Sequence, residues 1–550
     1  MEFKVNARYI FKGETKTTNS FENQEFNLAL THTGERVKLD IKVKEPVEFE
    51  KLEIYTDFDY DKSCRIFTNG YQSWTVSREY TPNSSMSEFN PKFMGINKKN
   101  FNPLGMWGAG DLTFHQYPEK RGVFYGYSYG YVRKGGDIFL FGSLSEKAGY
   151  TIITFDANAF KVYIEKDLQG VTLENDKTLL ELALIENSYE KAFDRYFEMM
   201  NIPPVRVDRK CGYTTWYNYY TNITQEIVER DLKAISQLNN KVDIFQIDDG
   251  YQRTVGDWLI TDEKKFPDGM KAVSDSIHQK GMMSGLWLAP FAVTPKSYIF
   301  KEHKDWLVTD EKGKYHYASH NWGGFYALDI YNEEVQAYLD EVFDTVLNQW
   351  GFDMVKLDFL YACCIRPIHN KSRGEIMCDA MDLIRKWCGD KIVLGCGVPL
   401  APAFGKVDFC RIGCDMALDW NKKPFSREDV STVNALTNTI FRRHLDGRAW
   451  LNDPDVFLLR ENNIKMPMSQ RKIIALINSI LGNLLFVSDD VSTYTDEQKE
   501  IFTRAVRKHD TSVESADFVS KNIIKIKYSI DGAPHMFTFN LHRGEVLQQD

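Results

Sequence analysis

The feature that most constrains the fold is an alternation of strand and helix patterns between residues 204 and 509. Short runs of almost continuous apolar residues recur there, and amphipathic helical patterns separate most of them. Apolar strands that alternate with helices are typical of a parallel sheet, and eight such units predict a (β/α)₈ barrel, also called a TIM barrel. The eight candidate strands are 211–216, 242–247, 282–288, 353–357, 391–397, 407–413, 448–452 and 483–488.

Two irregularities interrupt this alternation. A long gap follows the third candidate strand, which predicts an inserted loop around residues 321–329. Only a short segment, 398–406, joins the fifth and sixth candidate strands. A doubly wound open sheet is the alternative architecture, but no Gly-x-Gly-x-x-Gly turn supports it. The clearest helical patterns within this region cover 224–239, 333–350 and 427–445.

The chain on either side of the predicted barrel has β character. Short alternating strand patterns, punctuated by Gly, Asn, Asp and Pro, predict an N-terminal antiparallel β-sandwich. A helical pattern over 188–206 then stops at Pro203 and Pro204, a plausible hinge. The last stretch is typical of a few short strands. We therefore predict a sandwich at 1–203, the barrel at 204–509 and a short C-terminal β domain at 510–550.

Composition narrows the classes of function. A formal net charge of −9 over 550 residues gives no reason to expect binding to nucleic acid or to an anionic membrane. The first residues lack the apolar core of a secretion signal, and the apolar segment 473–487 is too short to span a bilayer. The nine cysteines lack the spacing of a disulfide framework or a metal site. We therefore expect a cytoplasmic protein without a metal.

Charged residues lie at the carboxyl ends of the predicted strands, where this barrel class places its active site. Lys356 and Asp358 are two residues apart, so on a strand both side chains point to the same face. A buried charge is unfavourable unless it is paired or functional. The other strand ends contribute Trp216, Tyr217, Asp248, Asp249, Trp287, Cys396, Arg411 and Asp415.

This combination of side chains indicates a small carbohydrate as the ligand. Carboxylates and cations can hydrogen-bond several hydroxyl groups, while tryptophan faces cover the apolar patches of a sugar ring. The absence of His and Cys ligands argues against a transition metal, and the absence of a Gly-rich loop argues against a phosphate. Two separated carboxylates then suggest glycoside hydrolysis, with one acting as nucleophile or base and the other as acid.

Five motifs, in order, resemble those of glycoside hydrolase family 36, and the likeness is closest to the compact bacterial α-galactosidases of melibiase type in clan D. They are QIDDGY…GDW, GLWLAPF, VKLDFL, GCGVPL…RIGCD and WLNDPD…LLR, and the segment NGYQSW at 69–74 extends the likeness over nearly the whole chain. The resemblance implies a retaining exo-α-galactosidase that needs no cofactor. Its substrates would be terminal α-galactosides of the melibiose or raffinose type, cleaved through a covalent galactosyl-Asp intermediate.

The resemblance also implies a role for each matching residue. Asp358 matches the catalytic nucleophile and Asp415 the acid/base. Lys356 would in addition lower the free energy needed to keep Asp358 ionised. Trp74 would reach the sugar from the predicted sandwich, although a core or interdomain position suits it equally well. The resemblance implies that Asp248 and Asp249 bind O4 and O6 of the sugar, that Lys356 binds O3 and O4, and that Arg411 binds O2. Cys396 would lie near the 2-position. The implied lining of the sugar pocket is Trp74, Trp216, Tyr217 and Trp287.

Two departures from the family pattern leave alternatives open. The first strand carries YTTW at 213–216, where the family often has Trp-Cys-Ser-Trp, and Cys414 replaces the Pro of close relatives. Position 414 should lie near the 2-substituent of the sugar, so an α-N-acetylgalactosaminidase is an alternative, as is an α-galactosyl transglycosidase. A binding protein on a relic barrel is disfavoured because both Asp358 and Asp415 are present. The carboxylates of 452–455 and 488–490 are interpreted as helix caps and left out of the site.

Overall fold

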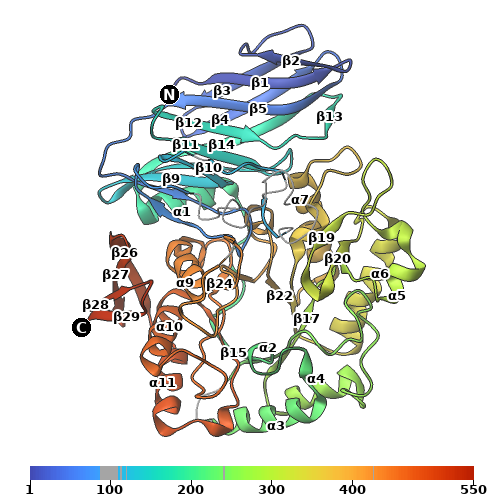
Figure 1. Cartoon of the computed structure of the whole chain (residues 1–550), viewed down its shortest axis with the longest axis vertical. Helices are drawn as coiled ribbons and strands as arrows, with labels where there is room; N and C mark the ends of the chain where they lie inside the picture. The colour runs from blue at the N-terminus through green and yellow to red at the C-terminus, as the bar shows by residue number, and fades with distance from the viewer. Residues whose placement is uncertain (87–108, 112–113, 119, 239–241, 425) are drawn as a thin grey trace.

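The computed structural model of the chain describes residues 1–550 except 87–108, 112–113, 119, 239–241 and 425. Two antiparallel sheets form the N-terminal part, an eight-stranded parallel sheet with helices around it forms the largest part, and a small antiparallel sheet ends the chain. Figure 1 shows the first part stacked above the parallel sheet and the small sheet beside α9 and α10 (Figure 1). The predicted fold class is confirmed.

The N-terminal sheets form a sandwich because their strands alternate between buried and exposed residues. In β4, for example, Val37, Leu39 and Ile41 are buried while the residues between them are not. One sheet has the order β2-β1-β5-β12-β11-β8 with β13 on β5, and the other has the order β3-β4-β14-β10-β9-β6-β7. The strands are β1 (Lys4–Phe11), β2 (Glu14–Thr18), β3 (Phe26–Thr33), β4 (Arg36–Val43), β5 (Val47–Asp57), β6 (Arg65–Thr68), β7 (Arg78–Tyr80), β8 (Val123–Tyr127), β9 (Tyr129–Lys134), β10 (Asp137–Ser143), β11 (Thr151–Asp156), β12 (Lys161–Lys166), β13 (Thr172–Leu173) and β14 (Lys177–Ser188).

Helix α1 (Tyr189–Met200) follows the sandwich and packs on β14 and β10. It ends at Asn201, whose left-handed backbone closes the helix. The first strand of the parallel sheet begins at Lys210. The predicted division at 203 and 509 stays a prediction.

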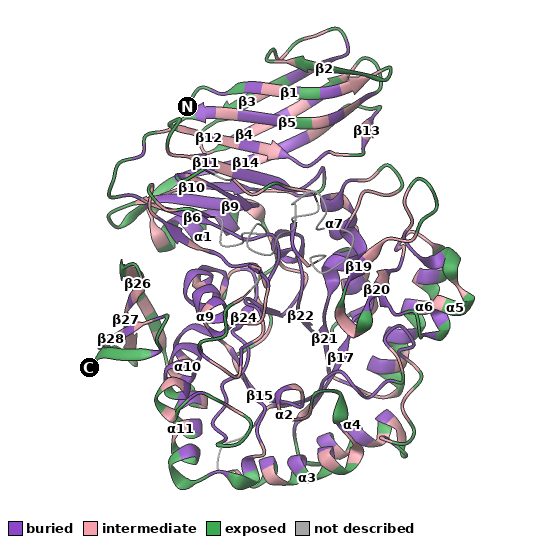
Figure 2. Cartoon of the chain, in the orientation of Figure 1, coloured by how far each residue is buried: buried purple, intermediate pink, exposed green. Residues whose placement is uncertain are grey.

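All eight predicted barrel strands are present, in the predicted order. They are buried along almost their whole length, as expected for a parallel sheet covered on both faces (Figure 2). The order is β24-β23-β22-β21-β17-β16-β15-β25, and the Asn483 N–H that donates to the Asn452 carbonyl at 2.9 Å brings the two ends of the sheet together. The strands are β15 (Lys210–Thr214), β16 (Ile244–Ile247), β17 (Met283–Leu288), β21 (Met354–Leu357), β22 (Ile392–Gly395), β23 (Phe409–Arg411), β24 (Leu451–Asp453) and β25 (Leu484–Val487).

Helices and short turns connect these strands. The α-helices are α2 (Trp216–Tyr219), α3 (Gln225–Ser236), α4 (Gly269–Gln279), α5 (Tyr298–Glu302), α6 (Glu333–Asp344), α7 (Arg373–Cys388), α8 (Leu400–Ala403), α9 (Thr432–Phe441), α10 (Met468–Leu481) and α11 (Asp496–Val506). The single-turn elements are η5 (Tyr220–Asn222), η6 (Lys304–Trp306), η7 (Asn321–Gly323), η8 (Thr345–Gln349, a π-turn), η9 (Leu360–Cys364), η10 (Arg443–Leu445) and η11 (Val491–Thr493).

Both predicted irregularities occur. The long segment after β17 contains a three-stranded antiparallel sheet of β18 (Ala292–Val293), β20 (Phe325–Ala327) and β19 (Tyr317–Ser319). Between β22 and β23 the only helix is the four-residue α8. The helix expected over 427–445 was predicted too long, because Ser431 caps α9 by accepting from the Asn434 N–H, and the residues before it form a loop.

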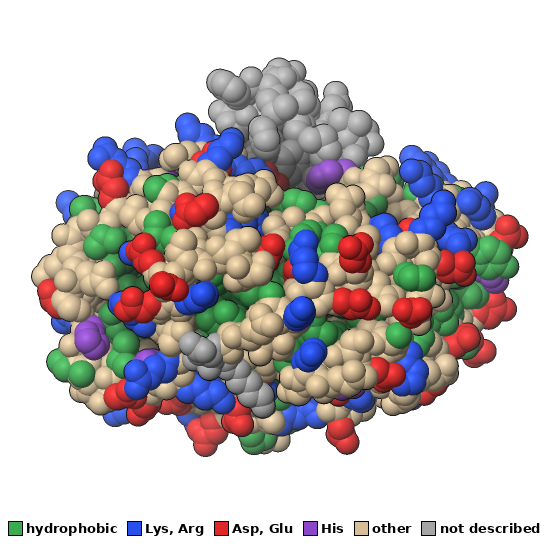
Figure 3. Space-filling view, turned by 90° about the horizontal axis from the view of Figure 1, so that it is seen from below, with side chains coloured by type: hydrophobic (Ala, Val, Ile, Leu, Met, Phe, Trp, Pro, Cys, Tyr) green, Lys and Arg blue, Asp and Glu red, His purple; other side chains and the backbone are tan. Residues whose placement is uncertain are grey.

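The C-terminal sheet consists of β26 (Thr511–Ser520), β27 (Ile523–Ile530), β28 (Ala533–Asn540) and β29 (Glu545–Gln549), paired antiparallel in chain order. The apolar segment that includes 473–487 forms α10 and β25, and no helix among the described residues is long and apolar enough to cross a bilayer. Acidic and basic side chains are interspersed over the face drawn in Figure 3. All nine cysteines are free thiols.

Candidate active site

A cavity of about 390 Å³ opens at the carboxyl ends of the barrel strands. This volume lies within the range of roughly 300–1,000 Å³ that is usual for small-molecule sites. Eight of the eleven predicted site residues line it, namely Trp74, Trp216, Asp248, Asp249, Trp287, Lys356, Asp358 and Asp415. The convergence follows from the sheet, because the ends of parallel strands meet at one rim.

Asp358 follows β21 directly and is 8% exposed. Its Oδ2 accepts a hydrogen bond from the Trp287 indole N–H at 3.1 Å, and its Oδ1 accepts one from the Phe359 N–H at 2.9 Å. Burial raises the pKa of Asp358 above its ordinary value, and the charge of Lys356, the Trp287 indole and the Cys396 thiol only partly offset this effect. The carboxylate is thus held rigidly in a dry position.

Lys356 is buried two residues earlier and contacts a different carboxylate. Its Nζ lies 2.8 Å from Asp248 Oδ2, and this oxygen also accepts from the Gln246 amide at 2.7 Å. Burial acts to lower the pKa of Lys356, but the charges of Asp248 and Asp358 outweigh it and raise the pKa. Lys356 therefore stays charged, pairs directly with Asp248, and acts on Asp358 only through space.

Asp415 lines the same cavity and differs from Asp358 in exposure. About a third of its side chain, 35%, is accessible, and its Oδ1 lies 2.9 Å from a guanidinium nitrogen of Arg411. Arg411 also bonds Asp453 at 3.1 Å and Asp455 at 2.8 Å, because β23 and β24 pair Arg411 with Asp453. One buried cation is thus shared among three carboxylates.

Asp455 is the most perturbed carboxyl group of this cluster. Burial raises its pKa to about 7, although Arg411 lowers it and Asp415 raises it further. The Tyr217 hydroxyl donates to Asp455 Oδ2, which also accepts from the Met416 N–H at 2.7 Å. The helix-cap interpretation is therefore wrong for Asp453 and Asp455, which hold Arg411; of the carboxylates at 488–490, Asp490 does cap η11.

Asp249 and two aromatic residues close another side of the cavity. The Trp322 indole donates to Asp249 Oδ2 at 2.8 Å, and the Gln252 amide donates to Oδ1 at 2.6 Å. Trp322 and Phe359 both have left-handed backbones, with φ of 57° and 54°, and their rings lie 4.7 Å apart. Bulky residues in this region of conformational space are unusual and often mark functional sites.

Trp74 completes the cavity from a loop of the sandwich. Its indole N–H donates to the Cys396 sulfur at 3.4 Å, and its ring meets Phe359 edge-on at 5.1 Å. Arg442 of the barrel holds this loop by donating to the carbonyls of Gln72 and Ser73 and to the Asn69 side chain. Trp74 thus lines the cavity and also lies between the sandwich and the barrel, so the two predicted alternatives do not exclude each other.

Three predicted residues lie behind the cavity wall. Tyr217 and Arg411 contact the carboxylate cluster described above, and Cys396 accepts from Trp74. Cys414, predicted near the sugar's 2-substituent, is 1% exposed, and its thiol faces the Ser431 carbonyl at 3.6 Å. Cys414 therefore does not line the cavity itself; its thiol contacts the loop 426–431, which does.

Sequence reasoning missed several residues of the cavity wall. Trp322 lies inside the predicted insertion. The tryptophan next to Gly323 and Gly324 could have indicated a residue of the ligand site in that loop. Glu428 gave no signal, because the predicted helix covered it. The other lining residues that were not predicted are Ala109, Gly110, Thr221, Ser319, His320, Asn321, Phe359, Ser426, Asp429 and Val430.

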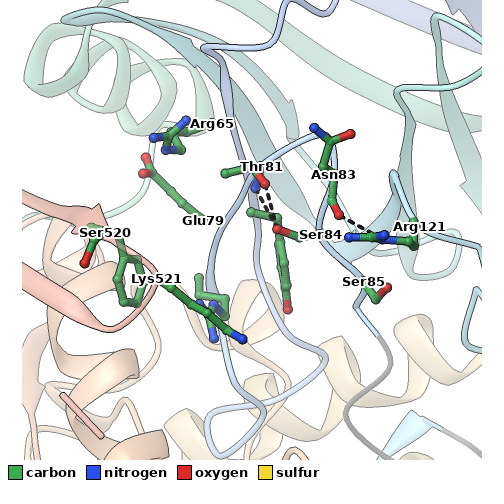
Figure 4. Close-up of a pocket in the computed structure, with 12 residues that line it drawn as sticks. Arg65, Glu79, Thr81, Asn83, Ser84, Ser85, Arg121, Ser520 and Lys521 are labelled. Carbon is green, nitrogen blue, oxygen red and sulfur yellow. Dashed lines mark hydrogen bonds between the residues drawn. The ribbon is translucent and has the colours of Figure 1, made fainter. Parts of the chain in front are cut away.

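A second cavity, of about 630 Å³, lies between β6 and β7 of the sandwich and the C-terminal sheet (Figure 4). Arg65, Arg78, Arg121 and Lys521 line it, with Glu79 as its only carboxylate among the described residues. Glu79 is paired with a guanidinium outside the cavity at 2.6 Å. Without two carboxylates this cavity offers no acid–base pair, in contrast to the cavity at the barrel mouth.

The fold and the cavity at the barrel mouth together define a (β/α)₈-barrel protein of the glycoside hydrolase type. The family model described as Melibiase matches residues 212–375. An α-galactosidase of Escherichia coli is 26% identical over 31% of this chain and 24% of that protein. An A type blood α-D-galactosamine galactosaminidase of Flavonifractor plautii is 30% identical over 24% of this chain and 13% of that protein. The chain thus aligns with a quarter or less of the length of these curated relatives.

Solved structures extend the likeness over almost the whole chain. The α-galactosidase TtGalA of Thermus thermophilus, in complex with p-nitrophenyl α-D-galactopyranoside, superposes with a TM-score of 0.71 at 22% identity and covers 96% of this chain and 98% of its own. AgaA of Geobacillus stearothermophilus, a GH36 α-galactosidase, gives 0.61 at 12% identity and covers 96% and 82%. The comparisons confirm the resemblance of this chain to the α-galactosidases of glycoside hydrolase family 36.

Proposed function

We propose that the protein is a retaining exo-α-galactosidase that removes terminal α-galactosyl residues from small oligosaccharides. One observation carries the proposal: two carboxylates with contrasting surroundings, buried Asp358 and accessible Asp415, face the same cavity. Retaining glycosidases use two such carboxyl groups, one as the nucleophile and the other as the acid/base. TtGalA, of the same fold, has also been seen in complex with stachyose.

In the proposed first step, Asp358 attacks the anomeric carbon while Asp415 donates its proton to the leaving oxygen. The C1–O bond breaks and a galactosyl ester of Asp358 forms. In the second step Asp415 takes a proton from water, the water oxygen attacks C1, and Asp358 leaves as a carboxylate. The Trp287 and Phe359 N–H groups, which already bond Asp358, receive the charge that returns to it.

Asp248, Asp249 and Lys356 are proposed to hold the galactose. Asp249 has acceptor oxygens fixed by Trp322 and Gln252, and Lys356 supplies donors beside Asp248. Fixed, buried partners favour recognition of a particular hydroxyl stereochemistry, since a mismatch leaves them unpaired. Arg411 pairs with Asp415, which lines the cavity. We therefore propose that Arg411 positions the Asp415 carboxylate and also binds the O2 hydroxyl of the sugar.

Hydrolysis of an α-N-acetylgalactosaminide is the second candidate, and transglycosylation through the same intermediate is a variant of the first. The galactosaminidase of Flavonifractor plautii, 30% identical over its aligned part, favours the second candidate. The proposal also includes a cytoplasmic location, which the nine free thiols support because a reducing compartment maintains them.

The test compares 4-nitrophenyl α-galactoside with the corresponding α-N-acetylgalactosaminide, and follows the first-formed sugar by proton NMR. We expect the galactoside to be cleaved faster and to yield α-galactose first, as retention requires. Faster cleavage of the N-acetylgalactosaminide would transfer the proposal to the second candidate. First release of the β-anomer would contradict the double displacement, and no cleavage of either would contradict hydrolysis.

A further inference from the structure

Glu428 is a further carboxyl group that lines the cavity, besides Asp358, Asp415 and the proposed sugar-binding Asp248 and Asp249. Glu428 lies in the loop 426–431 between β23 and α9 and is 8% exposed. Its N–H donates to the Ser426 hydroxyl at 3.2 Å, which fixes the loop. A Cβ placed on Gly110 would lie 3.1 Å from Glu428 Oε2, so the backbone of another segment presses against the carboxyl group.

The surroundings of Glu428 leave its carboxyl group incompletely satisfied. Oε1 is buried and has no hydrogen-bond partner among the described residues, although the Thr75 and Ser426 hydroxyls act on the group. Burial and the adjacent Asp111 carboxylate raise its pKa to about 7, and Arg427 lowers it only in part. Buried acceptors are normally paired, so an unpaired one at the wall of a ligand cavity indicates a partner supplied by the ligand.

The position of Glu428 identifies which part of a substrate it meets. The groups that act on Glu428 are Asp111, Arg427 and the Thr75 and Ser426 hydroxyls, whereas those that act on Asp249 are Trp322, Gln252, Asp248 and Asp358. Glu428 also shares a loop with the Ser431 N–H, which donates to the Asp415 carbonyl. The acid/base meets the leaving oxygen, so this loop borders the leaving group rather than the galactose.

We infer that Glu428 binds the leaving group by accepting a hydrogen bond from a hydroxyl of the sugar next to the terminal galactose. This inference rests on the proposed function and deepens it. Glu428 would make the protein favour an oligosaccharide over a galactoside whose leaving group has no hydroxyl on its ring. Its carboxylate form accepts more strongly than its acid form, so binding of the second sugar should strengthen as the pH rises through 7.

The experiment measures kcat/KM for raffinose and for 4-nitrophenyl α-galactoside in wild type and in Glu428→Gln. We expect the ratio of raffinose to aryl galactoside to fall about tenfold or more in Glu428→Gln, because a neutral amide oxygen accepts a hydrogen bond more weakly than a carboxylate oxygen. Glu497→Gln is the matched control, since Glu497 lies on the surface and pairs with Lys472. Its ratio should equal that of wild type.

Gly110→Ala provides a second route if Glu428→Gln folds poorly. The added methyl group crowds both carboxyl oxygens without changing any charge, so the same ratio should fall severalfold. Thermal unfolding of both variants reports their folding.

The pH profile distinguishes a binding role from a structural one. In wild type the KM for raffinose should fall between pH 6 and 8 relative to that for the aryl galactoside, and Glu428→Gln should remove this change. A ratio within twofold of wild type in every folded variant would overturn the inference. Wild type that cleaves no galactoside would instead overturn the proposed function. The charged and titratable groups that face Glu428 are Asp111, Tyr117, Tyr361 and Arg427, with Asp429 next in the chain.

Discussion

Asp358 and Asp415, the two carboxyl groups proposed for catalysis, are held in opposite ways. Asp358 is almost fully buried and bonded by two neutral N–H groups, and no cation among the described residues forms an ion pair with it. Asp415 is one-third accessible and directly paired with Arg411. A buried group can be kept in one orientation for attack on carbon, whereas an accessible one can exchange protons with water and with the leaving group. The difference suits a nucleophile and an acid/base.

The cations near these carboxylates are also shared differently. Lys356 serves one direct partner, Asp248, and still lowers the pKa of Asp358 through space. Arg411 is shared among Asp415, Asp453 and Asp455, so three carboxylates surround one positive charge. Asp455, whose pKa is raised to about 7, allows this cluster to keep a proton near neutral pH. Burial thus raises the pKa of Asp358 in spite of Lys356, whereas in the Arg411 cluster the raised pKa belongs to Asp455.

The strongest test of this comparison is Asp358→Ala. Removing the nucleophile should lower kcat/KM for 4-nitrophenyl α-galactoside on the order of 10⁴-fold or more, since no covalent intermediate can form. Added azide should restore activity by attacking from the vacated face, and NMR should identify β-galactosyl azide. Residual activity above one per cent of wild type, or an α-configured azide, would remove Asp358 from this role.

Asp415→Ala should have the next largest effect, and its size should depend on the leaving group. Loss of a general acid lowers rates by roughly 10²–10⁴-fold. We expect this loss with raffinose and a smaller one with 4-nitrophenyl α-galactoside, because a phenolate leaves without protonation. Azide should now give the α-product from the galactosyl ester. Equal losses for both substrates would contradict the assignment of Asp415 as the acid.

Lys356→Met tests whether a remote charge keeps Asp358 ionised. Lys356 lowers the pKa of Asp358, so its removal should raise that pKa further. The nucleophile must be ionised, and activity should therefore be lost at a higher pH than in wild type as the solution is acidified. We expect the acidic limb of kcat/KM to move up by about 1 pH unit.

Lys391→Met is the control for this shift, since Lys391 lies just before β22, away from the cavity, and donates to the Phe352 carbonyl. An acidic limb that stays in place in Lys356→Met, with folding intact by circular dichroism, would show that Lys356 acts only on Asp248.

Most of the cavity residues that the sequence could predict share one property: they lie at the ends of parallel strands, with Trp74 of the sandwich as the exception. Asp249, Lys356, Asp358 and Asp415 follow or close such strands, and the topology of a barrel alone brings these ends together. The partners of Arg411 were missed although the information was present, since the pairing of β23 with β24 places Arg411 beside Asp453.

Other parts of the site depend on long loops, for which a sequence gives no register. Trp322 reaches Asp249 from an insertion that folds as a small sheet of its own. Glu428 was assigned to a helix because the helical spacing of apolar and charged residues continues on both sides of Ser431. Only the hydrogen bond of the Ser431 side chain shows where α9 begins. Cys414 was expected near the sugar, but backbone direction after β23 turns its thiol toward Ser431.

The smallest expected effect concerns Trp74, which covers the Asp358 side of the cavity from the sandwich. Trp74→Ala removes a ring that meets Phe359 and a donor to Cys396, so the KM should rise about fivefold to tenfold, more than kcat falls. Trp74→Phe keeps an aromatic ring but loses the N–H, and should cost roughly half of that free energy. Because Trp74 lies on the galactose side, raffinose and the aryl galactoside should be affected equally, in contrast to Glu428→Gln. A loss restricted to raffinose would place Trp74 at the leaving group and would remove the division of the cavity into two sides.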